Sequence, residues 1–424
     1  MISKGSLPEA VVKSNQVPVP GILSIFEPIL SALNILGTCP LTKCNNNFGT
    51  SFKNWRTRVC FLIGSLGIIQ WLLFIWISGL RRSIMGFKVP TNVTTLVDKA
   101  QPLENNGSRQ SADFYVNITL NGSNFVVPTV HILEVLFCWA HSRAFGLFLN
   151  NFPKLEKMII DFSNELDLPM DYLHRIRQHK NIVCFGISAF GTSLIFTYAW
   201  HAVKMGSETV GIISVALLSG HLVFVPLLED LKVTLSYQSL AEILREVQNL
   251  LVFTERPWSP ERRKQKMKTI RQIVLDVREQ CQRACGWQQN RELMLILYSI
   301  LSITVSVYAV ITSYGLLWQD DTVFQIKVLF AGYGSVQIAR VSLKGMAADN
   351  LGRQESLLAE KIISLTAYEQ NDDIAFEAKV THDMLIQNPI RVSLGGIVTF
   401  NKALNLQIMS LVLTYLIVLA QYAE

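Results

Sequence analysis

The sequence predicts an all-α polytopic membrane protein with seven transmembrane helices, a cytosolic N-terminus, an extracellular C-terminus and long cytosolic helical extensions. Three observations support this fold class. Half of the 424 residues are hydrophobic and only 17% are charged, which is too apolar for an ordinary soluble domain. Several apolar runs are long enough to cross a bilayer as a helix. Glycosylation motifs and basic residues gather in different connecting segments.

The chain divides into a cytosolic N-terminal segment (1–58), six helices (59–343), a cytosolic anchor segment (344–402) and a final helix (403–424). Within the first segment, residues 21–36 are apolar but short and are interrupted by Glu27 and Pro28, which predicts an interfacial or re-entrant helix. A cytosolic helical loop is expected at 232–291. The seven expected spans are 59–80, 127–150, 181–203, 210–231, 292–317, 322–343 and 403–422.

The orientation is predicted by two independent patterns. All four N-x-S/T motifs fall in the polar loop 81–125, at Asn92, Asn106, Asn117 and Asn121, so this loop is expected to be extracellular or luminal and glycosylated. Most Lys and Arg residues lie in the segments that this assignment places in the cytosol. Both patterns predict a cytosolic N-terminus.

No motif for an enzyme or a cofactor is found. The sequence has no P-loop, no hydrolase elbow and no H-E-x-x-H zinc motif. The pairs Cys39/Cys44 and Cys281/Cys285 have spacings that could suggest zinc, but no histidine completes either set, so free thiols are favoured. We therefore expect a non-enzyme without cofactor or metal and without a nucleic-acid partner.

Polar and aromatic residues gather in the outer halves of the expected spans. Aromatic faces combined with carboxylates and amides suit a ring-bearing or polyhydroxylated small molecule. The alternative is an interfacial aromatic belt, especially for Trp200 and Trp318. The candidate ligand-binding residues are His131, Glu134, Tyr198, Trp200, His201, Tyr308, Thr312, Trp318, Asp320, Gln325 and Lys327.

The last helix carries a polar stripe. Thr414 and Gln421 are seven residues apart, nearly two helical turns, and Ile417 and Val418 lie between them on the same stripe. Polar side chains in a membrane helix usually face protein or water rather than lipid. Helix packing and a water-filled path are both consistent with this pattern.

The sequence T-Y-L-I-V-L-A-Q-Y from Thr414 to Tyr422 resembles the T-Y-(five apolar)-Q-F signature of insect gustatory receptors, with Tyr422 in place of the final Phe. The preceding N-P-I-R-V-S-L-G-G-I-V-T-F-N-K-A-L also resembles that family, although Asn401 and Lys402 replace an acidic-basic pair. Sugar-receptor members often carry Glu where this chain has Leu416, which argues against that branch.

This resemblance implies a chemosensory ligand-gated non-selective cation channel in the plasma membrane of chemosensory neurons, opened by a small-molecule tastant such as a sugar or another polar compound. It implies a homotetramer, or a heteromer with related subunits, in contact with membrane lipid and permeant cations. Gln421 and Tyr422 would stand near the outer gate, Thr414 and Val418 would line the path, and Tyr415 would brace the helix against its own subunit.

Two other functions remain open from the sequence. A seven-helix receptor coupled to a G protein would place its N-terminus outside the cell. Such receptors carry an N-P-x-x-Y motif, and this chain has Val392 at the position of the tyrosine. A small-solute transporter would usually show an internal repeat, and we find none.

Overall fold

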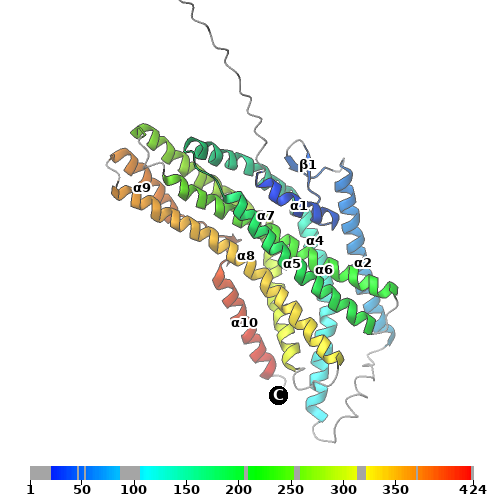
Figure 1. Ribbon diagram of the computed structural model, residues 1–424. Helices are drawn as coiled ribbons and strands as arrows, with labels where there is room; N and C mark the ends of the chain where they lie inside the picture. Colours follow the sequence, from blue (N-terminus) through cyan, green and yellow to red (C-terminus); the bar gives the residue numbers. More distant parts are fainter. Residues whose placement is uncertain are drawn as a thin grey trace, which may run out of the picture.

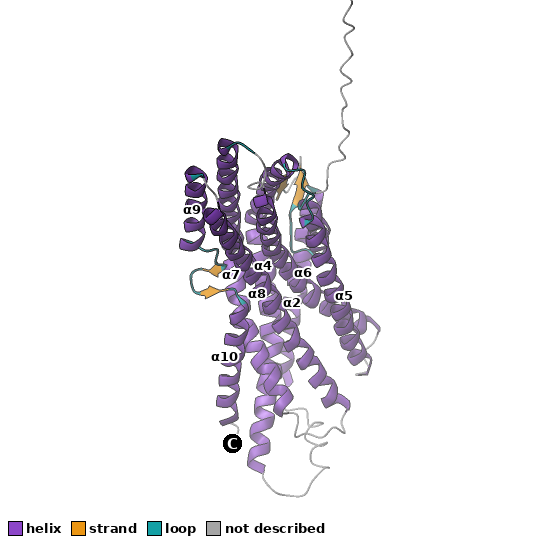
Figure 2. Ribbon diagram, turned by 60° about the vertical axis from the view of Figure 1, so that its left-hand side comes forward, coloured by secondary structure: helices purple, strands orange, loops and turns teal. Residues whose placement is uncertain are grey.

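The computed structural model describes residues 21–44, 47–51, 54–85, 106–204, 209–252, 258–312, 321–368 and 371–421, and within these ranges it is almost entirely helical. Nine helices and two short antiparallel hairpins make up these ranges (Figures 1 and 2). The helices are α1 (Leu23–Ile35), α2 (Trp55–Met85), α4 (Asn106–Glu165), α5 (Tyr172–Lys204), α6 (Thr209–Leu250), α7 (Pro260–Thr312), α8 (Asp321–Tyr368), α9 (Asp372–Gln387) and α10 (Lys402–Gln421). The hairpins pair β1 (Thr42–Cys44) with β2 (Asn47–Gly49) and β3 (Ser393–Leu394) with β4 (Val398–Thr399).

Five of the seven expected spans lie within one helix, and most of these helices extend well beyond the span. The spans 292–317 and 403–422 lie in α7 and α10 as far as the described residues reach. By length and composition, four stretches of the described residues could cross a membrane: Trp55–Trp76, Phe125–Glu165, Tyr172–Thr197 and Pro260–Tyr308. The number of spans and the orientation of the chain stay predictions.

The expected polar loop 81–125 differs from the structure at both ends. α2 continues to Met85, and α4 begins at Asn106, so the second part of this segment is helical. The stretch 106–125 contains no proline, and a helix already formed gains one hydrogen bond for each residue added. Three of the four glycosylation motifs therefore lie on α4, and Asn92 lies outside the described residues.

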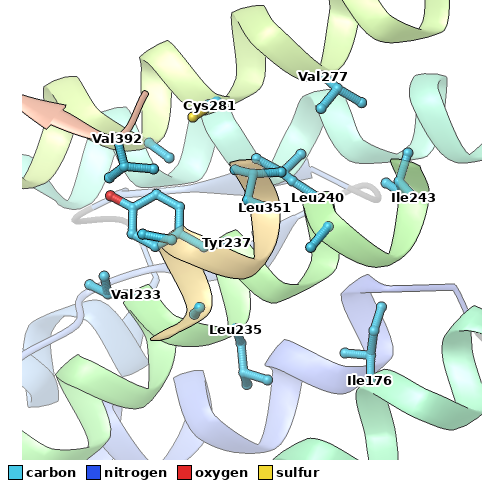
Figure 3. Packing of buried hydrophobic residues seen from close by; sticks show 14 of the residues in the cluster. Ile176, Val233, Leu235, Tyr237, Leu240, Ile243, Val277, Cys281, Leu351 and Val392 are labelled. Carbon is cyan, nitrogen blue, oxygen red and sulfur yellow. The ribbon is translucent and has the colours of Figure 1, made fainter. Parts of the chain in front are cut away.

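α6 is the central helix of the bundle. It packs along α5 and α8 and also contacts α1, α4 and α7. From 229 to 244 nearly every side chain is buried, which is typical of a helix surrounded by protein on all sides. Figure 3 shows the Tyr237 ring of α6 among Cys281, Leu351 and Val392. Its hydroxyl accepts a hydrogen bond from Gln288 on α7.

α1 packs against the bundle through a buried apolar stripe that includes Phe26 and Leu33. Gly37, just beyond its C-terminus, has a φ of +83°, a conformation that suits glycine because it has no Cβ. The backbone there passes so close to α2 that a Cβ on Gly37 would lie 2.3 Å from the Gly64 nitrogen. The indole of Trp139 on α4 donates a 2.7 Å hydrogen bond to the Gly37 carbonyl.

The basic first part of α7 forms ion pairs within the chain. Lys266 and Arg262 pair with Glu165 at the end of α4. Two carboxylates of α9 also pair with α7: Asp373 lies 2.9 Å from Lys264, and Glu377 lies 2.9 Å from Arg271. These pairs join the ends of α4, α7 and α9 in the region that the sequence assigns to the cytosol. We call the parts of α6, α7, α8 and α9 that pack together in this region the collar.

Candidate functional site

A small cavity lies between α4, α6, α7 and α8. Its volume of about 20 Å³ is enough for roughly one water or hydroxyl group. Half of the twelve lining residues are aliphatic, and the other half carry polar groups. It consists of Val127, Val130, His131, Glu134, Leu222, Val223, Pro226, Tyr298, Tyr333, Val336, Gln337 and Arg340.

One wall of the cavity is the seam between α7 and α8. The hydroxyls of Tyr298 on α7 and Tyr333 on α8 are hydrogen-bonded to each other. One turn further along α8, Gln337 accepts a 3.3 Å hydrogen bond from the Ser299 hydroxyl. A guest in the cavity would therefore touch side chains that hold these two helices together.

Another wall carries His131, which contacts a second histidine behind the lining. Nε2 of His131 on α4 lies 2.8 Å from Nδ1 of His221 on α6. Nε2 of His221 lies 3.1 Å from the carbonyl oxygen of Leu36, the C-cap of α1. The edge of Trp71 on α2 packs against the His131 ring. This chain of contacts connects the cavity to the buried end of α1.

The floor of the cavity is formed by Glu134 and Arg340, which belong to a buried cluster of six charged residues that we call the charge cluster. Arg340 on α8 contacts Asp230 on α6 at 2.5 Å and Glu134 on α4 at 2.7 Å. Arg291 on α7 contacts the same two carboxylates, at 3.0 Å and 2.5 Å. Each of these four side chains is at most 4% exposed.

Two further residues complete the charge cluster. Lys344 on α8 bonds to Asp230 at 3.1 Å and to Glu292, and Glu292 also accepts a 2.5 Å hydrogen bond from Arg291. Three carboxylates thus face three cations, so the formal charge is zero. Ionised groups this deeply buried persist only when they are paired and hydrogen-bonded. The cavity floor therefore presents no net charge, which favours an uncharged guest.

Sequence reasoning found only Glu134 of this cluster. Its partners were present in the same sequence as ionisable residues in, or at the ends of, apolar helices, at Asp230, Arg291, Glu292, Arg340 and Lys344. Equal numbers of opposite charges at one predicted depth could have indicated a network.

The candidate ligand residues have different placements. His131 and Glu134 line the cavity together. Tyr308 is buried on α7 but is not part of the lining. Trp200 is half exposed and stacks on Phe196, as an interfacial belt residue would. The side chains of Tyr198, His201, Thr312, Gln325 and Lys327 and all of Trp318 and Asp320 lie outside the described part of the chain.

α10 is largely exposed along its length. It leaves the β3–β4 hairpin and packs mainly along α7 and α8, beside the rest of the bundle (Figure 2). Leu404, Ile408 and Val412, spaced four residues apart, form its buried stripe. Tyr415, expected to brace α10 against its own subunit, is 49% exposed, and Leu416 contacts the core instead.

The exposed face of α10 carries the polar stripe, and the stripe is longer than the sequence reading found. Gln407, Thr414 and Gln421 repeat every seven residues and are all exposed, with Ser410 on the same side. Gln407, Ser410 and Thr414 line a shallow surface groove together with Leu406 and Leu411. Extending the seven-residue spacing back from Thr414 would have found Gln407.

The remaining predicted pore residues follow the same face. Ile417 and Val418 are exposed, while Tyr422 lies outside the described residues. Thr414 donates a 3.0 Å hydrogen bond to the Ser410 carbonyl within the helix, so its hydroxyl is satisfied without a partner from another helix.

The helices able to span a membrane, and the way they are bundled, define a multi-pass helical membrane protein of the fold found in insect olfactory receptors. The structure of the insect olfactory receptor OR5 from Machilis hrabei superimposes with a TM-score of 0.67 at 13% sequence identity, over 95% of this chain and 98% of that one. The structure of OR5 in complex with eugenol gives 0.66 at 12% identity over the same shares. No family model and no curated protein matches the sequence. At this identity the likeness establishes a shared fold.

Proposed function

We propose that the chain is a subunit of a chemosensory ligand-gated cation channel, opened by a small-molecule tastant. The fold is shared with an insect olfactory receptor, one structure of which holds eugenol, and the C-terminal motif resembles that of insect gustatory receptors. The motif favours the taste branch, and Leu416 argues against the sugar-sensing members of it.

The observation that carries the proposal is the polar stripe of α10. Gln407, Ser410, Thr414 and Gln421 face away from the rest of the chain, on a helix otherwise composed mainly of apolar residues. Lipid is a poor environment for such a face, so it requires contact with protein or water. Four copies of α10 around one axis, or copies of related subunits, would line a water-filled path for cations.

The packing of α10 suggests how a ligand would open this path. The cavity is lined partly by α7 and α8, and α10 packs on the same two helices. A tastant is much larger than the present 20 Å³, so its binding would displace side chains along the α7–α8 seam. Movement of that seam would carry α10 and widen the path between subunits.

The other residues named from the sequence take roles under this proposal. Seven candidate residues near the outer ends of the helices would form the entrance to the cavity: Tyr198, His201, Thr312, Trp318, Asp320, Gln325 and Lys327. Trp200 would lie at the lipid interface. Asn92 and the other three motifs would be glycosylated on the extracellular side. The collar would hold neighbouring subunits together in the plasma membrane of chemosensory neurons.

The proposal is tested by recording ligand-evoked currents from cells that express the chain. Gln421→Ala is expected to change single-channel conductance or the permeability ratio among cations. Met409→Ala is a matched control, because Met409 is exposed on α10 but lies away from the polar stripe. Unchanged permeation in a functional Gln421→Ala channel would exclude this face as the pore lining, and saturable uptake without channel conductance would identify a transporter.

A further inference from the structure

We propose that Nδ1 of His131 accepts a hydrogen bond from the ligand, so that the cavity selects uncharged molecules carrying a hydroxyl or N–H donor over isomers that can only accept. This inference rests on the proposed function in taking the cavity as the ligand site. It adds the chemical class of the ligand and the atom that recognises it.

The direction of the hydrogen bonds follows from a backbone carbonyl. The Leu36 oxygen can only accept, so His221 must donate from Nε2. A neutral imidazole carries one N–H, which leaves Nδ1 of His221 as an acceptor. His131 must then donate from Nε2 to His221, and its own Nδ1 keeps a lone pair. Neutral rings are expected because a charged imidazole without an acidic partner is costly to bury.

That lone pair is buried and has no partner. His131 is 2% exposed, its ring lines the cavity, and its Nδ1 makes no hydrogen bond within the described structure. A buried polar atom without a partner is unfavourable, and a donor from the guest would relieve it. A guest that offers only an ether oxygen would place a second lone pair against the first.

The other polar groups around the cavity do not offset this preference. Pro226 has no backbone N–H, so it offers the cavity no donor. The donors of Arg340 that the structure pairs are directed at Asp230 and Glu134. A tyrosine hydroxyl and a glutamine amide can both donate and accept, so Tyr298, Tyr333 and Gln337 do not discriminate. Glu134 accepts hydrogen bonds from Arg291 and Arg340. Among the lining side chains, the buried acceptor without a partner is Nδ1 of His131, so selection falls to this residue.

The test measures binding of isomeric pairs to the purified full chain in lipid nanodiscs. 2-Phenylethanol and benzyl methyl ether have the same formula, as do cyclohexylmethanol and methoxycyclohexane, so size and the cost of widening the cavity are matched within each pair. Each alcohol is expected to bind about tenfold more tightly than its ether, the difference that one buried hydrogen bond typically makes.

Two variants separate the roles of the histidines. His131→Phe removes the acceptor, so it should weaken binding of the alcohols. It also removes the lone pair that opposes the ether oxygen, so the ethers should bind as tightly as before or more tightly. His221→Phe removes the group that fixes the tautomer, so His131 can then donate from Nδ1 and the ethers should bind more tightly. His174→Gln, on the exposed face of α5, is the control and should keep the wild-type ratio.

Equal affinity within both pairs would overturn the inference, as would no binding by any of the four probes. The inference would also be overturned if either folded Phe variant kept the wild-type ratio of alcohol affinity to ether affinity. If one Phe variant fails to fold, the other variant still tests the inference. Binding is measured separately from current, so the two proposals can fail independently. Selective binding by a chain that conducts no ions would contradict the proposed channel. A ligand-gated current without a preference for alcohols would contradict this inference alone.

Discussion

Arg340 on α8 donates a hydrogen bond from Nε to the Asp230 carboxylate on α6 at 2.5 Å, and neither side chain is more than 4% exposed. The two residues are 110 positions apart in the chain. Their contact fixes α8 against the central helix directly below the cavity. It makes the floor of the candidate ligand site part of what holds the bundle together.

Neutralising one side of this contact should strongly destabilise the protein. Arg340→Met removes one of the cations that pair with Asp230 and Glu134. We expect the free energy of unfolding to fall by about 3–5 kcal/mol. Lys264→Met, which breaks a partly exposed ion pair with Asp373, should cost less than about 1 kcal/mol. Thermal unfolding in detergent compares them, and equal shifts in the two variants would contradict the role of burial.

The close approach of α1 and α2 predicts a second sensitive position. Gly37→Ala would add a Cβ 2.3 Å from the Gly64 nitrogen and would place an alanine at a positive φ. We therefore expect the free energy of unfolding to fall by about 1–3 kcal/mol or more. Gly186→Ala in α5 meets no atom within 4 Å and should be neutral or stabilising by up to about 1 kcal/mol. Both are measured by thermal unfolding, and a tolerated Gly37→Ala would show that the two backbones can separate.

The collar contains a titratable contact with a predictable pH dependence. Arg278 bonds through Nε (2.9 Å) and Nη2 (2.7 Å) to Glu355, which also accepts from the Ile390 backbone N–H. Burial raises the pKa of Glu355 above its usual value, and the Ile390 N–H and Arg278 act against that rise. Arg278→Met should therefore raise the pKa of Glu355 further.

A carboxyl with a raised pKa in the folded state favours folding at low pH, and this contribution falls as pH rises from the unfolded pKa through the folded one. The stability lost in Arg278→Met should thus be smaller at a pH of about 5 than at about 7.5, because protonation removes the unpaired charge. Unfolding midpoints of wild type and variant at both pH values measure this difference. A constant difference would mean that Glu355 does not titrate in this range.

Water access along α10 can be mapped with single cysteines. Cysteines at Gln407, Ser410 and Thr414 should react with a water-soluble thiol reagent and reduce ligand-evoked current, whereas cysteines at Ile408 and Val412 should not. The native chain is the background control, because six of its own cysteines are buried or half-buried. Reaction at the buried positions with equal speed would argue that α10 is not packed on α7 and α8.

The orientation predicted from the glycosylation motifs is open to a direct test. Removal of N-linked glycans should increase the gel mobility of the chain, and changing all four motif asparagines to Gln should abolish that change. An epitope tag at the N-terminus should bind antibody only after the cells are permeabilised. Binding on intact cells would favour a receptor of the opposite orientation.

The helical segments could be predicted because a run of about 20 apolar residues has few alternatives to a helix in a bilayer. Five of the seven expected ranges fall within one helix for that reason, and the described parts of 292–317 and 403–422 lie in α7 and α10. The extension of α4 back to Asn106 could not be seen, because its polar, motif-rich sequence is equally typical of a loop. Apolar length indicates where a span lies and says little about where the helix ends.

The candidate site was only partly predictable. His131 and Glu134 were found because an ionisable residue in an apolar run is conspicuous. The contact of His131 with His221 could not be found, since nothing in the sequence pairs residues 90 positions apart on different helices. Trp200 was included because its position near a helix end fits both a pocket and a lipid interface.

The end of α1 has a consequence for the biosynthesis of the protein. Its Gly37 carbonyl is bonded by Trp139 and its Leu36 carbonyl by His221, residues made 102 and 185 positions later. During synthesis, α1 is made before α4 and α6, so these bonds cannot form until both of those helices have been made. Until then the apolar stripe of α1 has no partner within the chain to cover it. We therefore expect nascent chains that end before α6 to bind membrane-associated chaperones.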